Sequence, residues 1–145
     1  MKPSWNGMSQ EDRILINNGC GPAWFPLKAK RFIDRHFMAW MFDAGCGHHD
    51  FGYIVGGGEL RRWMCDLKLA KAMLNDVKLC FKHGDYNNFI IGLFSGTVFY
   101  IALFLFGWTS FEYGRQKSRG EVIAYARFKH GETSFIQRLK RFRWK

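Results

Sequence analysis

The clearest pattern in the chain is the stretch at residues 89–108, which carries no charged side chain over 20 positions. As a helix rising about 1.5 Å per residue it would extend roughly 30 Å, the thickness of the hydrocarbon core of a bilayer. Trp108, at its end, suits the membrane–water interface. The pattern therefore predicts a transmembrane helix. A buried core helix is the less favoured alternative, because residues 1–88 offer little surface to enclose it.

Two further helices are predicted before this segment. Residues 28–55 contain no proline and end at the run Gly56-Gly57-Gly58. Residues 59–82 carry apolar side chains at steps of three and four, the spacing of one helix face, and we expect this stripe to form the core. Because the glycine run favours a tight turn, the two helices are predicted to pack antiparallel. The stripe consists of Leu60, Trp63, Leu67, Ala70, Leu74, Val77 and Phe81.

The first 27 residues are predicted to be irregular. Positions 17–22 read Asn-Asn-Gly-Cys-Gly-Pro, a run of turn formers. Backbone carbonyls in such a segment need unusual partners, and a bound cation is one of them.

The charge of the chain is concentrated near its C-terminus. The formal net charge is +10, and residues 109–145 hold 10 Lys or Arg against 3 Glu. A basic segment of this kind binds phosphate, either on anionic lipid headgroups or on nucleic acid. Aromatic and cationic residues interleave at 135–145, which favours a membrane surface. Nucleic-acid binding through residues 115–145 is the alternative.

The candidate chemistry lies at the end of the helix predicted for 28–55. Cys46, His49 and Tyr53 are spaced by three and four residues and share a face, whereas Asp50 lies about 100° round the helix from His49. Histidine can serve as a general base near neutral pH if a partner fixes its tautomer. In an antiparallel pair, Asp66 on the next helix comes opposite His49. Asp50 is then the candidate carboxylate for a hard cation, with carbonyls from a preceding loop.

These residues resemble those of a known family. The pattern Cys46-x-x-His49-Asp50-x-x-Tyr53 follows a Gly19-Cys20-Gly21 loop and precedes Cys65-Asp66. It is similar to the secreted-type phospholipase A2 family, and is closest to its compact bacterial, fungal and viral members, which share an HDFGY-like segment. The resemblance covers about residues 17–80.

The resemblance implies a role for each residue. His49 looks like the base that takes a proton from water, Asp66 like the aspartate that orients it, and Tyr53 like the tyrosine that hydrogen-bonds this aspartate. Asp50 looks like the calcium carboxylate, with Gly19 and Gly21 as carbonyl ligands. Ala23 stands where animal enzymes have a third such glycine. Cys20 and Cys46 look like the disulfide that ties the calcium loop to the helix.

The sequence therefore predicts an all-α fold in three parts: a phospholipase A2-like catalytic domain at 1–88, a transmembrane helix at 89–108 and a basic, aromatic-rich tail at 109–145. The domain consists of two antiparallel helices carrying a His/Asp site, preceded by a calcium-binding loop. The expected function is calcium-dependent hydrolysis of the sn-2 ester of membrane phospholipids. The alternative is a non-enzymatic structural or membrane-perturbing protein, of viral or phage type, that keeps the fold.

The expected partner is a phospholipid bilayer, with a homo-oligomer through the transmembrane helix as a further expectation. The expected location is a membrane crossed once, with the catalytic domain on the non-cytoplasmic side, or a virion. A zinc site formed by Cys46, His48 and His49 with Cys20 or Cys65 is a less favoured alternative. Cys65 and Cys80 lie roughly 22 Å apart on one predicted helix, too far to bridge each other.

Overall fold

The computed structural model describes residues 3–17, 20, 27–36 and 39–129, and within these ranges the chain is helical with no strand. Gly19 and Gly21 of the predicted calcium loop, and the basic end of the tail at 130–145, lie outside the described residues. The elements are η1 (Trp5–Gly7), α1 (Gln10–Ile16), α2 (Leu27–His36), η2 (Ala39–Phe42), α3 (Asp43–Val55), α4 (Glu59–Lys82), α5 (Tyr86–Phe106) and η3 (Gly107–Thr109). A last helix occupies 119–129.

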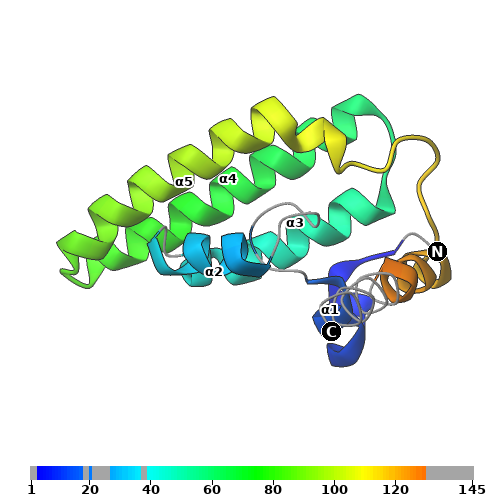
Figure 1. Cartoon of the computed structure of the whole chain (residues 1–145), viewed down its shortest axis with the longest axis horizontal. Coiled ribbons are helices and arrows are strands. Elements are labelled where there is room, and N and C mark those ends of the chain that lie inside the picture. The colour runs from blue at the N-terminus through cyan, green and yellow to red at the C-terminus, as the bar shows by residue number, and fades with distance from the viewer. Residues whose placement is uncertain (1–2, 18–19, 21–26, 37–38, 130–145) are drawn as a thin grey trace, which may run out of the picture.

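Helices α4 and α5 lie side by side as one layer, with α3 and α2 beneath them (Figure 1). Helix α4 has the predicted bounds of 59–82. Gly56 and Gly57, which have positive φ angles of 73° and 136°, turn the chain so that α3 and α4 run antiparallel. A Cβ at Gly56 would lie 2.2 Å from the carbonyl oxygen of Glu112, so the turn also admits the segment that follows α5.

The prediction of one helix over 28–55 is wrong. Helix α2 ends at His36, and α3 begins only at Asp43 after the 3-10 turn η2. The break lets Phe42 enter the core with no exposed surface, beside Cys46 and Leu69. Burial of this aromatic side chain offsets the helical hydrogen bonds lost at the break.

The prediction that residues 1–27 are irregular is also wrong for part of the segment. Helix α1 occupies Gln10–Ile16, and the Ser9 hydroxyl caps it by accepting a hydrogen bond from the backbone N–H of Asp12. Ile16 and Met8 are buried against α3 and the helix at 119–129. Part of the predicted tail therefore contributes to the same core as the N-terminal helix.

The predicted apolar stripe of α4 coincides only in part with its core face. Val77 of the stripe is buried and Trp63 and Ala70 are half-buried, whereas Leu60, Leu67, Leu74 and Phe81 are exposed. The other buried positions of α4 are Arg62, Asp66, Leu69 and Met73. Because α3 and α5 both pack on α4, its buried face lies between these two neighbours, about 100° round from Leu67. The position of two partner helices, and not the hydrophobicity of α4 alone, sets which face is buried.

Helix α5 packs along α4 through small residues. Gly92 and Ser95 are buried, and a Cβ at Gly92 would lie 3.0 Å from Cγ2 of Val77. The rest of α5 is largely exposed: the segment Tyr86–Thr109 is long and apolar enough to span a membrane, yet only 11% of its most apolar window is buried. The structure thus has one candidate membrane-spanning helix among its described residues.

We expect the close approach of α4 and α5 to depend on Gly92. In Gly92→Leu the added side chain collides with Val77 and with Met41. A Cβ at position 92 would already lie 3.3 Å from the sulfur of Met41. The free energy of unfolding should fall by about 1–3 kcal/mol, measured by urea unfolding followed by circular dichroism. The control Gly120→Ala, where nothing lies within 4 Å, should be neutral or stabilising. Equal stability in both variants would contradict this packing.

Candidate active site

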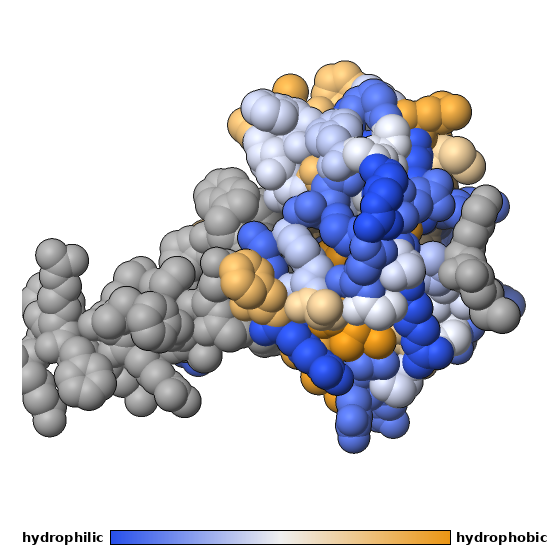
Figure 2. Space-filling model, turned by 90° about the vertical axis from the view of Figure 1, so that its right-hand side faces the viewer, coloured by the Kyte–Doolittle hydropathy of each residue, from blue (hydrophilic) through white to orange (hydrophobic). Residues whose placement is uncertain are grey.

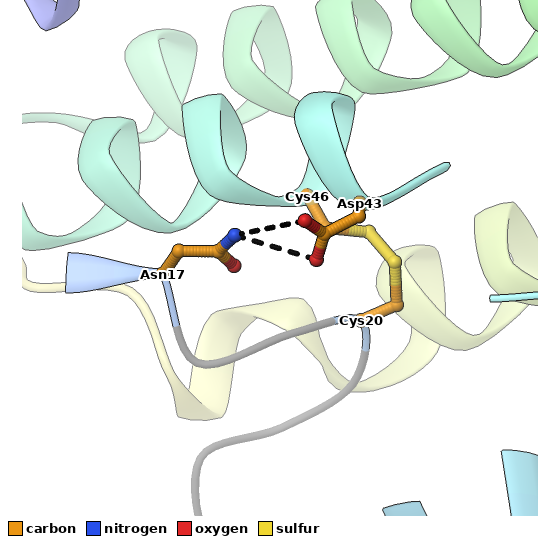
Figure 3. The surroundings of a disulfide bond; sticks show 4 residues. All are labelled: Asn17, Cys20, Asp43 and Cys46. Carbon is orange, nitrogen blue, oxygen red and sulfur yellow. Dashed lines mark hydrogen bonds between the residues drawn. A yellow bond between two sulfur atoms is a disulfide. The ribbon is translucent and has the colours of Figure 1, made fainter. Parts of the chain in front are cut away.

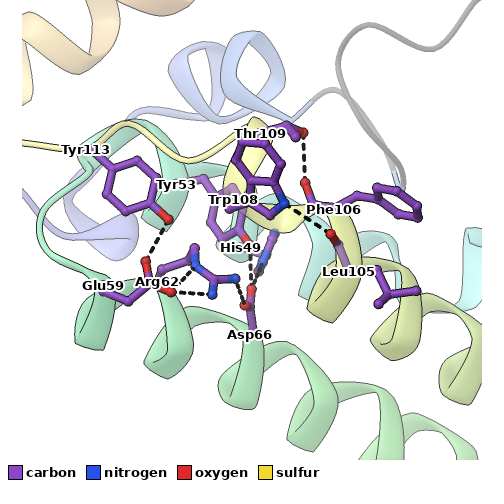
Figure 4. Close-up of polar contacts among 10 residues, drawn as sticks. All are labelled: His49, Tyr53, Glu59, Arg62, Asp66, Leu105, Phe106, Trp108, Thr109 and Tyr113. Atoms are coloured by element: carbon purple, nitrogen blue, oxygen red, sulfur yellow. Dashed lines mark hydrogen bonds and ion pairs between the residues drawn. The ribbon is translucent and has the colours of Figure 1, made fainter.

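Three side chains that the sequence singles out meet between α3 and α4. Oδ1 of Asp66 lies 2.9 Å from Nε2 of His49 and accepts a hydrogen bond of 2.6 Å from the hydroxyl of Tyr53 (Figure 4). His49 and Tyr53 are one turn apart on α3, and the centroids of their rings lie 4.0 Å apart. The predicted placement of Asp66 opposite His49 is confirmed.

Asp66 is buried, with only 2% of its surface exposed. A carboxylate at such a position needs compensating donors. Besides His49 and Tyr53, Nη1 of Arg62 donates to Oδ2 of Asp66 over 3.3 Å. Asp66 therefore has a hydrogen-bond partner on each oxygen, and these donors compensate for the burial of its side chain.

Arg62 was not among the site residues predicted from the sequence. It lies one turn before Asp66, is only 4% exposed, and also hydrogen-bonds Glu59, with 2.9 Å between Arg62 Nε and Glu59 Oε1. Its hydrogen bond with Glu59 holds the pKa of the guanidinium above its usual value. The sequence signal for Arg62 is the spacing Glu59-x-x-Arg62-x-x-x-Asp66, but the same spacing also occurs on exposed helix faces.

The partner of His49 fixes its tautomer. Because an ionised Asp66 can only accept, Nε2 of neutral His49 carries the proton and Nδ1 keeps a lone pair. An imidazole held this way can take a proton from water at Nδ1 and is stabilised by Asp66 when it becomes charged. The arrangement is that of a general base with an orienting carboxylate.

A second residue that sequence analysis missed, Gly107, closes the site from the side of α5. A Cβ at this position would lie 2.5 Å from the hydroxyl oxygen of Tyr53, so only glycine leaves room for the bond to Asp66. Phe111 packs edge-on against the Tyr53 ring with centroids 5.2 Å apart. Burial and the hydrogen bond to Asp66 raise the pKa of Tyr53 well above its usual value.

The disulfide implied by the resemblance is present between Cys20 and Cys46, whose Cα atoms lie 5.3 Å apart (Figure 3). It fixes Cys20 to α3 one turn before Asp50, which is half-buried. Nearby, the Asn17 side-chain amide lies 3.3 Å from both carboxylate oxygens of Asp43. Two separate bonds thus hold the N-terminal segment against the start of α3.

The described residues contain no group of three or more His, Cys, Asp or Glu side chains that could hold a metal ion. The zinc alternative loses two of its ligands, because Cys20 and Cys46 are bonded to each other. A calcium site of one carboxylate and loop carbonyls is a different donor set. Asp50 belongs to the described residues, whereas Gly19 and Gly21 do not.

A cavity of about 350 Å³ borders His49 and is lined by residues of α3 and α4 together with Pro3 and Trp5. Its lining is partly apolar and includes two cations, Arg61 and Lys68, and it also includes His48 but not Asp50. The structure therefore brings together His49, Tyr53 and Asp66, and places Asp50 outside both this cluster and this cavity.

We expect Tyr53 to ionise at a higher pH than an ordinary phenol does. Above the usual phenol pKa of 10.0, the unfolded chain loses a proton that folded Tyr53 retains, so the stability of the fold should decrease as pH rises through this range. In Tyr53→Phe this decrease should be smaller, while stability at neutral pH falls by about 1–3 kcal/mol with the lost bond to Asp66. Urea unfolding at pH 7 and pH 11 measures both effects. An identical decrease in the two proteins would show that Tyr53 is not the group responsible.

No family model, no curated protein and no solved structure matches this chain.

Proposed function

We propose that the protein hydrolyses the sn-2 ester of membrane phospholipids in a calcium-dependent reaction of the phospholipase A2 type. The observation that carries the proposal is the hydrogen bond between buried Asp66 and Nε2 of His49, which leaves Nδ1 as the basic nitrogen. The bond from Tyr53 to the same carboxylate oxygen, and the Cys20–Cys46 disulfide, support it. These contacts match the roles that the phospholipase A2 resemblance implies.

In this mechanism, Nδ1 of His49 takes a proton from a water molecule. The oxygen of that water forms a bond to the carbonyl carbon of the ester, and the bond from this carbon to the glycerol oxygen then breaks. His49 passes its proton to the departing glycerol oxygen. The products are a fatty acid and a lysophospholipid, and Asp66 stabilises the imidazolium while it exists.

Asp50 is the proposed protein carboxylate for calcium, with the carbonyls of Gly19 and Gly21 as its partners. An acidic oxygen donor beside a loop of carbonyls fits a hard cation. The disulfide supports this donor set, because it fixes the residue between the two glycines to the turn of α3 that precedes Asp50. Calcium, when bound, would polarise the ester carbonyl and stabilise the negative oxygen that develops on it.

The proposed location is a membrane, reached through α5. The sequence predicts that residues 89–108 cross the bilayer once, with the catalytic domain on the non-cytoplasmic side or on a virion, and the disulfide suits such an oxidising environment. The packing of α4 sets a condition on a crossing. Because α4 lies along α5, a crossing by α5 would bring the charged side chains of α4 into the hydrocarbon region. Each such charge near the centre costs about 2.5–3.5 kcal/mol. Oligomerisation through α5 and nucleic-acid binding through the tail stay predictions.

Replacing the proposed base tests the chemistry. His49→Gln keeps a polar side chain of similar size but cannot take the proton, so the release of fatty acid from phospholipid vesicles in calcium should fall by about 100-fold or more. The control His83→Gln changes an exposed histidine at the end of α4 and should be as active as the wild type. Circular dichroism should show that both variants are folded. Equal activity in His49→Gln would refute the proposed mechanism.

Calcium binding is tested separately by isothermal titration with calcium chloride. Asp50→Asn removes the proposed carboxylate and should weaken binding at least about tenfold, whereas Asp76→Asn, on α4, should leave it unchanged. Chelation of calcium should abolish fatty-acid release by the wild type. A wild-type protein that binds membranes but neither binds calcium nor releases fatty acid would favour the non-enzymatic membrane protein.

A further inference from the structure

One side of the α4–α5 hairpin is apolar and uncovered. On α5 the exposed side chains include Ile90, Leu93, Phe94, Ile101 and Phe104. Leu74 of α4 lines the groove between the two helices together with Leu93. The exposed residues Leu60 and Leu67 lie on the same face of α4 as Leu74, at steps of seven residues. We call this combined surface the hairpin face. The end view in Figure 2 shows several hydrophobic side chains on the upper rim, where α4 and α5 lie, among hydrophilic ones.

A row of lysines borders the hairpin face on α4. Lys71 lies one turn after Leu67 and Lys78 one turn after Leu74, and Lys82 continues the row. All three lysines are exposed, and no ion pair between described residues involves them. An apolar strip edged by uncompensated cations complements a surface with acyl chains beneath anionic phosphates.

Contacts along the whole hairpin show how deep these lysines would lie if α5 crossed a bilayer. Near one end of the hairpin, the ring centroids of Trp63 and Phe104 lie 5.4 Å apart. Near the other end, the ring centroids of Phe81 and Phe89 lie 5.1 Å apart. Lys71 falls between these contacts and would therefore lie beside the middle of α5. A crossing with the fold intact would place this charge in the centre of the hydrocarbon.

We propose that the α4–α5 hairpin lies in the plane of an anionic phospholipid bilayer, with the hairpin face in the acyl region and Lys71, Lys78 and Lys82 on lipid phosphates. This placement satisfies the apolar surface of α5 and the charges of α4 without opening the contacts between them. It depends on the surface of the hairpin and not on the chemistry at His49, so it stands or falls independently of the proposed hydrolysis.

Matched substitutions on the two sides of α4 test the face. Leu67→Glu and Leu74→Glu alter side chains that are 56% and 44% exposed, and Leu79→Glu alters one that is 53% exposed on the other side of the helix. Cosedimentation of the full chain with phosphatidylglycerol vesicles should weaken about tenfold or more in the first two variants and remain unchanged in the third. Equal losses in all three, or no binding by the wild type, would overturn the proposal.

The lysine row is tested in the same assay. The double variant Lys71→Gln/Lys78→Gln should bind phosphatidylglycerol vesicles about 30-fold more weakly, and salt should weaken wild-type binding in the same direction. Lys68→Gln, which removes a cation on the side of the cavity, should bind nearly as the wild type does. Equal binding to phosphatidylcholine and phosphatidylglycerol would contradict the role of the lysines.

The two ends of α5 distinguish a flat hairpin from a crossing helix. A nitrobenzoxadiazole label is attached at Tyr86→Cys or Trp108→Cys, with Cys65 and Cys80 replaced by Ser, and the protein is added to preformed vesicles. External dithionite should reduce both labels at once if the hairpin lies flat. Protection of either label until detergent is added would show a crossing. Self-association of the wild type that Leu67→Glu abolishes, without vesicle binding, would assign the face to a second copy of the chain.

Discussion

The carboxyl group of Asp66 lies in the interior of a small protein, and the side chains around it compensate for its burial. Three donors from two helices reach its two oxygens: His49, Tyr53 and Arg62. Each donor is itself buried or held by a further contact, so the cluster fixes the register of α3 against α4. Removing any one donor leaves part of a buried carboxylate uncompensated, which is the most destabilising kind of polar change in a core.

The spacing of residues was enough to predict part of this cluster, because helix periodicity decides which side chains share a face. His49 and Tyr53 followed from their separation of four, and Asp66 followed from a tight antiparallel turn at three glycines. Arg62 was missed because an arginine one turn from an aspartate is equally common on a wet surface. Gly107 was missed because its role is a contact with Tyr53 across more than fifty positions of chain, which no local pattern records.

The bounds of α4 could be predicted because local sequence signals set them, whereas its core face depends on the positions of two neighbouring helices. Helix α4 has the expected bounds, since a glycine run and a basic end delimit it. Its core face was misplaced because its most regular apolar positions, Leu60, Leu67 and Leu74, repeat every seven residues, while the true core must face α3 and α5 together. Helix α1 was not predicted, although Ser9 followed by Asp12 three positions later is a signal for the start of a helix. The run of turn formers at 17–22 led to the prediction of an irregular segment instead. The loop that would ligate calcium, apart from Cys20, falls outside the described residues.

The glycine at the end of α5 links two parts of the molecule that would otherwise be independent. Gly107 lies against the hydroxyl of Tyr53, and the chain continues through Phe111 against the same ring. The most lipid-like helix of the protein therefore ends on the residue that helps to hold the histidine's carboxylate. Gly107 and Phe111 thus connect the end of α5 to Tyr53, so the position of α5 bears directly on the hydrogen bond that Tyr53 donates to Asp66.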